Sequence, residues 1–424
     1  MGVKAKNNIE IEARMVHGKT DRHESREDWG FAGVMILGDM KKDIVEDGYE
    51  QTRVEGNKNT IKGHFSESYS GTVLKRGSSQ TVSGNWTLNA KGSVSIESAG
   101  ELSRKWHSEE HTGFSGIGIT TKGGSIGTEV SHKGTVDRVE TETLKQVGGE
   151  YLTGGEVRIE NEEGDITLKG VSMIQGGDLN VEAKKGKVRL EVAEEYEKEK
   201  THHEDKTISL YQGVGNKVVD AAISAQNAYN NAKNALGQKG GTVNSELSRA
   251  AKLLEATVSA AQAAYAVKEI AESANSAASF GFYGCLTVTE SKVNQDTERE
   301  SRGGKGTALI SEKGNMQLKG ERVTLEGATL MTEGKKVIDG KQGVELLSKE
   351  RSSRQKESSG TESKSITVTV SGGGASTTGE YSKSEQGSEA EEVGHLQTQI
   401  RGGGLLIKTE GDAVVKGADV VALS

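Results

Sequence analysis

The segment Val188-Arg189-Leu190-Glu191-Val192 alternates apolar and polar residues, and its pattern occurs four times along the chain. The other copies are Ile9-Glu10-Ile11-Glu12-Ala13, Val94-Ser95-Ile96-Glu97-Ser98 and Val344-Glu345-Leu346-Leu347-Ser348. A period of two is typical of a strand with one buried face. Gly92, Gly186 and Gly343 precede three of the copies, so we expect a corner before the strand.

A second motif places a short strand between two glycines. It occurs as Gly164-Asp165-Ile166-Thr167-Leu168-Lys169-Gly170, as Gly314-Asn315-Met316-Gln317-Leu318-Lys319-Gly320 and as Gly411-Asp412-Ala413-Val414-Val415-Lys416-Gly417. The copies of the first motif are 85, 94 and 156 residues apart, and the last interval falls to 93 without the Ala-rich residues 217–279. We therefore predict a repeat of roughly ninety residues that is interrupted once.

Polar, charge-dense stretches follow the first motif, for example Arg104 to His111, Glu194 to Lys206 and Lys349 to Lys364. After each stretch the alternation returns, as in Ile208-Ser209-Leu210 and in Ile366 to Val370. We interpret the unit as a strand, a solvated excursion and a further strand, and we expect proline to be tolerated between Glu194 and Lys206 but not at Val188.

Composition favours a long parallel β stack. The 424 residues contain no proline, although average usage would supply about twenty-one. Strands paired on both sides exclude proline most strongly, and the 57 glycines would supply the corners. Only 17 residues are aromatic, which is little material for one large globular core. We call one complete turn of such a stack a coil. With about fifteen to eighteen coils at ~4.8 Å each, the stack would be roughly 70–85 Å long.

The interruption at residues 217–279 has the pattern of an αα-hairpin. Val218, Val219, Ala222 and Ile223 open a helical face, residues 237–241 break it, and Asn244 can cap a second helix. We interpret it as a surface insertion that packs on itself. The predicted organisation is thus 1–216 β repeats, 217–279 Ala-rich helical insertion and 280–424 β repeats.

We assign no catalytic, cofactor-binding or metal-binding residue. His107-Ser108-Glu109-Glu110-His111 matches the zinc-protease pattern H-x-x-E-H, but it lies in a polar excursion, where we expect a solvated loop. Gly18-Lys19-Thr20 lacks the first glycine of a phosphate loop, and Gly372 to Gly374 and Gly402 to Gly404 are interpreted as turns. The net charge of −8 disfavours nucleic acid, and the single Cys285 forms no internal disulfide.

The two ends of the chain fall inside repeats, and no polar capping repeat is visible. The N-terminus lacks the apolar region of a signal peptide, and no apolar run is long enough to span a bilayer. We expect the chain to be an internal segment, or a broken reading frame, of a longer array.

The chain resembles haemagglutinin repeats in four features. These are the Gly-flanked strands, the couplets after Lys91-Gly92 and Lys185-Gly186, the tail from Ser348 to Ser365, and Tyr381-Ser382-Lys383-Ser384. Such repeats occur in filamentous-haemagglutinin-like exoproteins of Gram-negative bacteria. The resemblance covers nearly the whole chain outside 217–279 and is weakest over the first seventy residues. It implies a right-handed parallel β-helix in a cell-surface filament exported by an outer-membrane two-partner secretion transporter.

The resemblance also implies a role in adhesion or in contact-dependent growth inhibition, with the target cell's outer membrane or a receptor as a partner. Our leading hypothesis is a non-enzymatic structural segment that helps to present or deliver a C-terminal toxin. The alternatives are an adhesin that binds a host glycan or protein and, more remotely, a β-helical polysaccharide-processing enzyme. We expect no cofactor, no small-molecule substrate and a secreted, cell-surface location.

Overall fold

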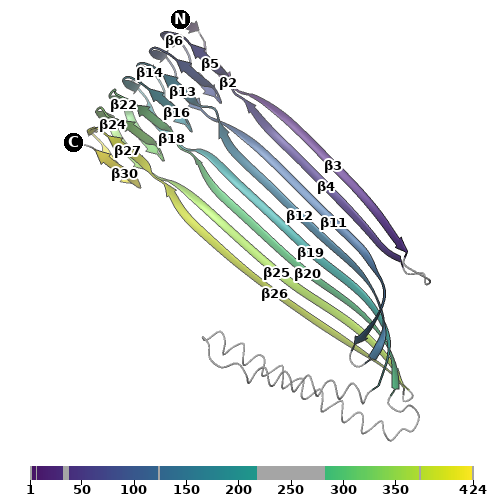
Figure 1. Ribbon diagram of the computed structural model, residues 1–424. Helices are drawn as coiled ribbons and strands as arrows, with labels where there is room; N and C mark the ends of the chain where they lie inside the picture. The colour runs from purple at the N-terminus through teal and green to yellow at the C-terminus, as the bar shows by residue number, and fades with distance from the viewer. Residues whose placement is uncertain are drawn as a thin grey trace.

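The structure, a computed structural model, describes residues 2–5, 7–31, 38–122, 125–216, 282–371 and 374–422, and this part of the chain is mainly β. It has two parts that lie side by side: a stack of short strands, in which both chain ends lie, and a sheet of much longer strands that extends away from the stack (Figure 1). The predicted αα-hairpin at 217–279 lies outside the described residues and stays a prediction. Within those residues, no helix combines the length and the hydropathy that a bilayer span requires.

The short strands form three parallel stacks that the chain visits in the same order in every coil. The first stack contains β1 (Gly2–Ala5), β6 (Phe65–Tyr69), β9 (Trp86–Ala90), β14 (Val157–Asn161), β17 (Leu179–Ala183), the first halves of β22 (Met316–Glu326) and β24 (Lys336–Leu347), and β28 (Leu405–Lys408). The second contains β2 (Ile9–Glu12), β7 (Val73–Arg76), β10 (Val94–Glu97), β15 (Ile166–Lys169), β18 (Lys187–Glu191), the second halves of β22 and β24, and β29 (Asp412–Lys416).

The third stack closes each coil. It contains β5 (Lys58–Ile61), β8 (Ser79–Val82), β13 (Glu150–Thr153), β16 (Ser172–Gln175), β21 (Ala308–Ser311), β23 (Thr329–Thr332), β27 (Thr398–Gly402) and β30 (Ala418–Ala422). The described residues therefore make eight coils, which span about 35–40 Å at the usual strand spacing. The expected fifteen to eighteen coils are wrong, because much of the chain enters the long strands.

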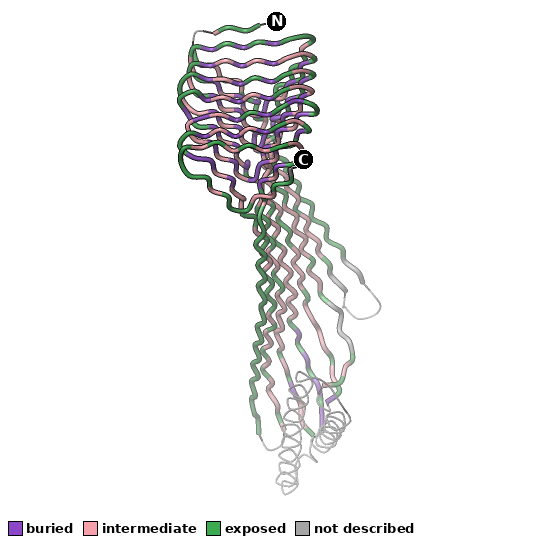
Figure 2. Tube along the Cα trace, turned by 90° about the vertical axis from the view of Figure 1, so that its left-hand side faces the viewer, coloured by how far each residue is buried: buried purple, intermediate pink, exposed green. Residues whose placement is uncertain are grey.

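The core lies inside the coils, and along most of their strands buried residues alternate with less buried ones (Figure 2). Parallel pairing in register places like residues above one another, so that Val94, Ile166, Val188 and Val323 form one ladder of the second stack. All four side chains are buried. Burial at roughly 25 cal/mol per Å² of apolar surface is thus shared between neighbouring coils and does not reside in one central core.

The long strands come from alternate coils and form one antiparallel sheet, which we call the hairpin sheet. Its four hairpins follow β2, β10, β18 and β24. In spatial order its strands are β26 (Gly374–Leu396), β25 (Lys349–Ser371), β20 (Phe282–Lys305), β19 (Ala193–Asn216), β12 (Ser125–Val147), β11 (Ala99–Lys122), β4 (Gly38–Glu55) and β3 (Arg14–Phe31). Each repeat therefore consists of two coils and one hairpin, which confirms the period of about ninety residues.

One backbone position decides whether the chain turns the corner or leaves the coil. In coils two, four, six and eight this position is Gly77, Gly170, Gly327 or Gly417, each with φ between 54° and 73°. Glycine adopts this left-handed conformation without strain, and the chain then continues to the third stack. In the other coils the hydrogen-bonded equivalents are Ala13, Ser98, Val192 and Ser348, and the chain continues into a hairpin.

This difference explains the two sequence motifs. The four copies of the alternating couplet occupy the second stack in the coils that carry hairpins. The glycine-flanked segments at 164–170 and 411–417 occupy the same stack in coils that do not. The assignment of 314–320 to this set is wrong, because that segment belongs to the first stack. In its coil, the segment that corresponds to 164–170 is the second half of β22, which ends before Gly327.

The sequence pattern predicted that the polar excursions are solvated loops. This prediction is wrong, because the excursions form paired strands. Glu194 to Lys206 lies within β19, which pairs with β12 on one side and with β20 on the other. The excursion and the alternating segment after it form one strand of 24 residues. Charged side chains are compatible with this because both faces of a single-layer sheet reach solvent.

One coil holds an ion pair inside the core. Glu67 and Lys75 occupy ladder positions that Leu88 and Ile96 fill in the next coil. Their side chains are 2% and 3% exposed, and Lys75 Nζ lies 2.7 Å from Glu67 Oε1. Tyr69 Oη and Trp86 Nε1 also donate hydrogen bonds to the Glu67 carboxylate, at 2.6 and 2.9 Å. Burial lowers the pKa of Lys75, and the Glu67 carboxylate opposes this shift.

The pairing of β19 makes proline a test of the ladder. Val188→Pro in the second stack and Thr201→Pro in β19 each remove a backbone donor from a strand paired on both sides. We expect each to lower the free energy of unfolding by about 2–4 kcal/mol, measured by denaturant unfolding. Lys185→Pro, at the exposed corner before β18, is the control. If Thr201→Pro is as mild as Lys185→Pro, β19 is not a central strand.

The buried ion pair gives a second prediction. Glu67→Leu leaves the Lys75 ammonium and two hydrogen-bond donors without their acceptor, and we expect a loss of about 3–5 kcal/mol in the free energy of unfolding. The double variant Glu67→Leu with Lys75→Ile continues the apolar ladders and should recover part of this loss. A double variant that is less stable than Glu67→Leu alone would contradict this account of the pair.

Candidate functional site

The hairpin sheet is the candidate functional region because it exposes two broad faces of side chains. Residues that pair across an antiparallel sheet lie on the same face, and neighbours in sequence lie on opposite faces. We call the face that carries His107, His111 and His203 the histidine face, and the opposite face, which carries Leu210 and Val288, the apolar face.

The H-x-x-E-H pattern lies on β11, and the expectation of a loop is wrong there too. In a strand, His107, Glu109 and His111 all point to the same face because they are two residues apart. β4 pairs with β11 on one side and places Asp47 opposite His107 and Asp43 opposite His111. β12 pairs on the other side and places Asp137 opposite Glu109, next to His203 of β19.

These residues form a network of imidazoles and carboxylates. Nδ1 of His107 lies 2.5 Å from Asp47 Oδ1, and Nδ1 of His111 lies 2.7 Å from Asp43 Oδ1. The Nε2 atoms of both rings face Glu109, at 3.0 and 3.6 Å. The Glu109 carboxylate therefore lies between the two rings.

A third imidazole extends this network across the histidine face. Nδ1 of His203 lies 2.6 Å from Asp137 Oδ1, and its Nε2 lies 3.5 Å from Asp205 Oδ2. The Thr135 hydroxyl donates a hydrogen bond to Asp205 and, as the largest contribution, lowers the pKa of that carboxyl group. Within the described ranges, no group of three or more His, Cys, Asp or Glu side chains has the geometry to hold a metal ion.

Hydrogen bonding to carboxylates raises the pKa of all three histidines. The largest contributions come from Asp47 for His107, from Asp43 for His111 and from Asp137 for His203, and partial burial opposes each of them. Protonation of the three imidazole rings would thus offset the negative charge of the neighbouring carboxylates. Because the side chains are about half exposed, each pair stabilises the sheet by no more than about 1 kcal/mol.

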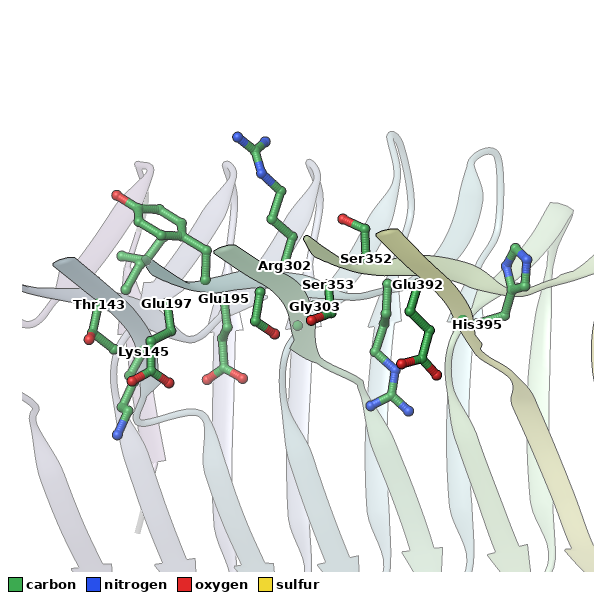
Figure 3. Close-up of a pocket in the computed structure, with 16 residues that line it drawn as sticks. Thr143, Lys145, Glu195, Glu197, Arg302, Gly303, Ser352, Ser353, Glu392 and His395 are labelled. Atoms are coloured by element: carbon green, nitrogen blue, oxygen red, sulfur yellow. The ribbon is translucent and has the colours of Figure 1, made fainter. Parts of the chain in front are cut away.

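A groove of about 690 Å³ lies where the hairpin sheet meets the coils (Figure 3). Charged side chains line it, including Lys145 and Glu195 from the neighbouring strands β12 and β19, and Glu197 and Glu392 from one row of paired residues. Gly303 lies between Glu195 and Arg351 and leaves room between these two side chains. Sequence reasoning missed this groove, because its residues come from five hairpin strands and only their register brings them together.

The remaining motifs lie in ordinary parts of the β fold. Gly18-Lys19-Thr20 is inside β3 and pairs with Gln51, Glu50 and Tyr49 of β4, so it forms no phosphate loop. Gly402 ends β27 with φ of 104°, and Gly403 and Gly404 form the corner before β28, as expected of turns; Gly372 and Gly373 lie outside the described residues. Cys285 is buried on β20 as a free thiol.

The hemagglutinin repeat model matches residues 130–270 and 286–423 of this chain. The chain belongs to the hemagglutinin repeat family. The first match also includes most of the Ala-rich segment, and residues before 130 share the same coils and hairpins. No curated protein matches the chain, and no solved structure matches it either.

Membership of the hemagglutinin repeat family confirms the resemblance seen in the sequence. These repeats are structural, adhesin-type repeats of secreted cell-surface proteins, and they imply a two-partner secretion context. In this hemagglutinin repeat chain, the faces of the hairpin sheet and the groove at its base present side chains to solvent.

The histidine network predicts a pH dependence of the sheet. A raised pKa in the folded state means that protonation stabilises the fold; this contribution is complete below the ordinary histidine pKa of about 6.5 and is lost as the pH rises through the raised value. NMR titration should give a pKa above 6.5 for His107, His111 and His203. Asp47→Asn should lower the pKa of His107 and leave that of His203 nearly unchanged. An unchanged His107 pKa in this variant would contradict the assigned pairing.

Proposed function

We propose that this chain is a non-enzymatic structural segment of a secreted cell-surface filament and that it helps to deliver a C-terminal toxin to neighbouring bacteria. The repeat geometry carries the proposal. Every repeat adds two coils to the stack and two strands to the hairpin sheet, so the array gains length without changing its cross-section. Such an architecture suits a spacer, and family membership supports its location outside the cell.

We further propose that the coils form a right-handed parallel β-helix. The three stacks are parallel and are visited in a constant order, and crossovers between parallel strands of a sheet are right-handed in about 98% of cases. Export through an outer-membrane two-partner secretion transporter fits this fold. Each coil that emerges can bury its apolar side chains on the previous one, and the described cysteine, Cys285, is free.

An adhesin segment is the second candidate, and the groove at the base of the hairpin sheet favours it. The groove combines acidic, basic and hydroxyl side chains, for example Glu195, Arg351 and Ser353, within reach of solvent. Such a mixture suits a polar ligand of the kind that a host glycan or a protein surface offers. In this case the hairpin sheet would be the binding element, and the coils would support it.

Deletion of one whole repeat tests the structural role in the polypeptide that carries these residues. Removing Trp86 to Asp178 takes out two coils and one hairpin, so that the corner at Asn85 continues directly into β17. We expect surface display and protease resistance to be kept, and killing of neighbouring cells to fall by less than about threefold. The matched control removes only one coil, Val157 to Asp178, which brings two hairpins too close together and should abolish display.

Two outcomes would decide against the proposal. If the whole-repeat deletion is displayed normally but abolishes killing, residues 86–178 contain a specific site and are not a spacer. If the intact filament binds host cells and never inhibits neighbouring bacteria, the adhesin role is correct.

A further inference from the structure

The ends of the long hairpins carry an apolar surface that the sequence pattern would place inside a core. Val130, Leu210, Val288 and Ile366 form one row across four neighbouring strands, from β12 to β25. The alternation that marks this part of the sequence is typical of a strand with one buried face. In the structure, however, these side chains lie on the apolar face and meet solvent.

A second row lies nearer the hairpin ends. Ile126 and Val214 pair directly, and Gly284 connects Val214 to Val370. We define the tip patch as Ile126, Leu210, Val214, Val288, Ile366 and Val370. Their exposed fractions lie between 44% and 65%, which is high for large apolar side chains on adjacent strands.

The opposite face of the same strands is different. Tyr211, Ser209, Cys285 and Ser125 alternate in sequence with members of the tip patch or pair next to them, and all four are buried. The Tyr211 and Ser125 hydroxyls lie 2.8 Å apart. At the hairpin ends the two faces therefore differ: these four residues are buried, whereas the side chains of the tip patch are exposed.

The size of the tip patch favours a protein surface as the cover. Its six side chains expose on the order of 500 Å², and Phe282 and Leu286 extend it on the same face toward the ~800 Å² that a stable interface buries on each partner. A single sheet with one apolar face is half of a two-layer arrangement, and sheets normally complete it by packing face to face.

Shape and charge favour a second copy of the same surface. A Cβ atom at Gly284 would meet no atom within 4 Å, so this glycine leaves a hollow between Val214 and Val370 that an apolar side chain of a partner can fill. The border of the patch carries both signs of charge. Glu290 lies beside Lys364 in the next row, and Lys206 lies 2.8 Å from Glu290. Two such borders can pair with each other without bringing only like charges together.

We propose that the tip patch is a self-association surface, through which two copies of this chain pack the ends of their hairpin sheets face to face. The strands β12, β19, β20 and β25 are 23 or 24 residues long, and the coils lie at their other end, about 55–70 Å from the tip patch. The coils therefore do not obstruct this packing. The proposal goes beyond the filament role, because it links two filaments side by side.

Analytical ultracentrifugation of the 424-residue chain tests the proposal. We expect a monomer–dimer equilibrium, with the dimer present at micromolar concentration. The variant Leu210→Glu with Ile366→Glu should raise the dimer dissociation constant at least tenfold and leave the circular dichroism spectrum unchanged. Val393→Glu is the matched control, since Val393 is an exposed valine on the same face near the coils. It should not change the dissociation constant.

Cross-linking gives a second measurement that does not depend on losing association. In a Cys285→Ser background, Gly284→Cys at the centre of the patch should give a covalent dimer with a short bis-maleimide. The proposal is overturned if the wild-type chain is monomeric at 100 micromolar, if the double variant dimerises normally, or if Val393→Glu disrupts the dimer equally. It is also overturned if removing residues 217–281 is needed for the dimer to form, or if the patch binds neutral lipid vesicles in place of a second copy.

Discussion

The spacing between hydrogen-bonded strands, about 4.8 Å, is the constraint on which the architecture depends. It is the same for the parallel pairs of the coils and for the antiparallel pairs of the hairpin sheet. A hairpin contributes two strands, and it therefore occupies as much length as two coils. Hairpins on every coil would not fit, and hairpins on every third coil would leave gaps in the sheet. Because coils with and without a hairpin alternate, the stack of coils and the hairpin sheet grow by equal lengths over the described chain.

A second, local constraint on the backbone dihedral angle φ accompanies the two paths that the chain takes. A glycine with positive φ at the end of the second stack directs the chain around the corner, as at Gly170, and a residue with a side chain, such as Val192, precedes a hairpin. Steric limits favour glycine over residues with a side chain in the left-handed region that this corner uses. The core around it is uniform enough to accept either path, because the buried ladders continue through both kinds of coil.

Much of this fold could be predicted from the sequence, and the missing part has a clear physical reason. Alternation in segments such as Val188 to Val192 and the absence of proline were sufficient to predict parallel strands, and the spacing of the repeated segments predicted the ninety-residue period. Charge density misled the interpretation of Glu194 to Lys206, because polar residues predict a loop only when a strand must have one buried side. In a sheet with solvent on both faces, that signal is lost. The groove and the histidine network depend on register between distant strands, which no local pattern specifies.

The combination of a stack of coils and a hairpin sheet also has a mechanical consequence. A load applied along the stack pulls adjacent strands directly apart, and in the coils each step holds only three short pairs of strands. The hairpin sheet places a pair such as β19 and β20, with 24 matched residues, beside two such steps. Because this sheet lies to one side of the coils, it also resists bending in the plane that contains both. The array is therefore stiffer in the plane that contains the coils and the hairpin sheet than in the plane at right angles to it, and the position of the hairpins sets the direction in which it bends most easily.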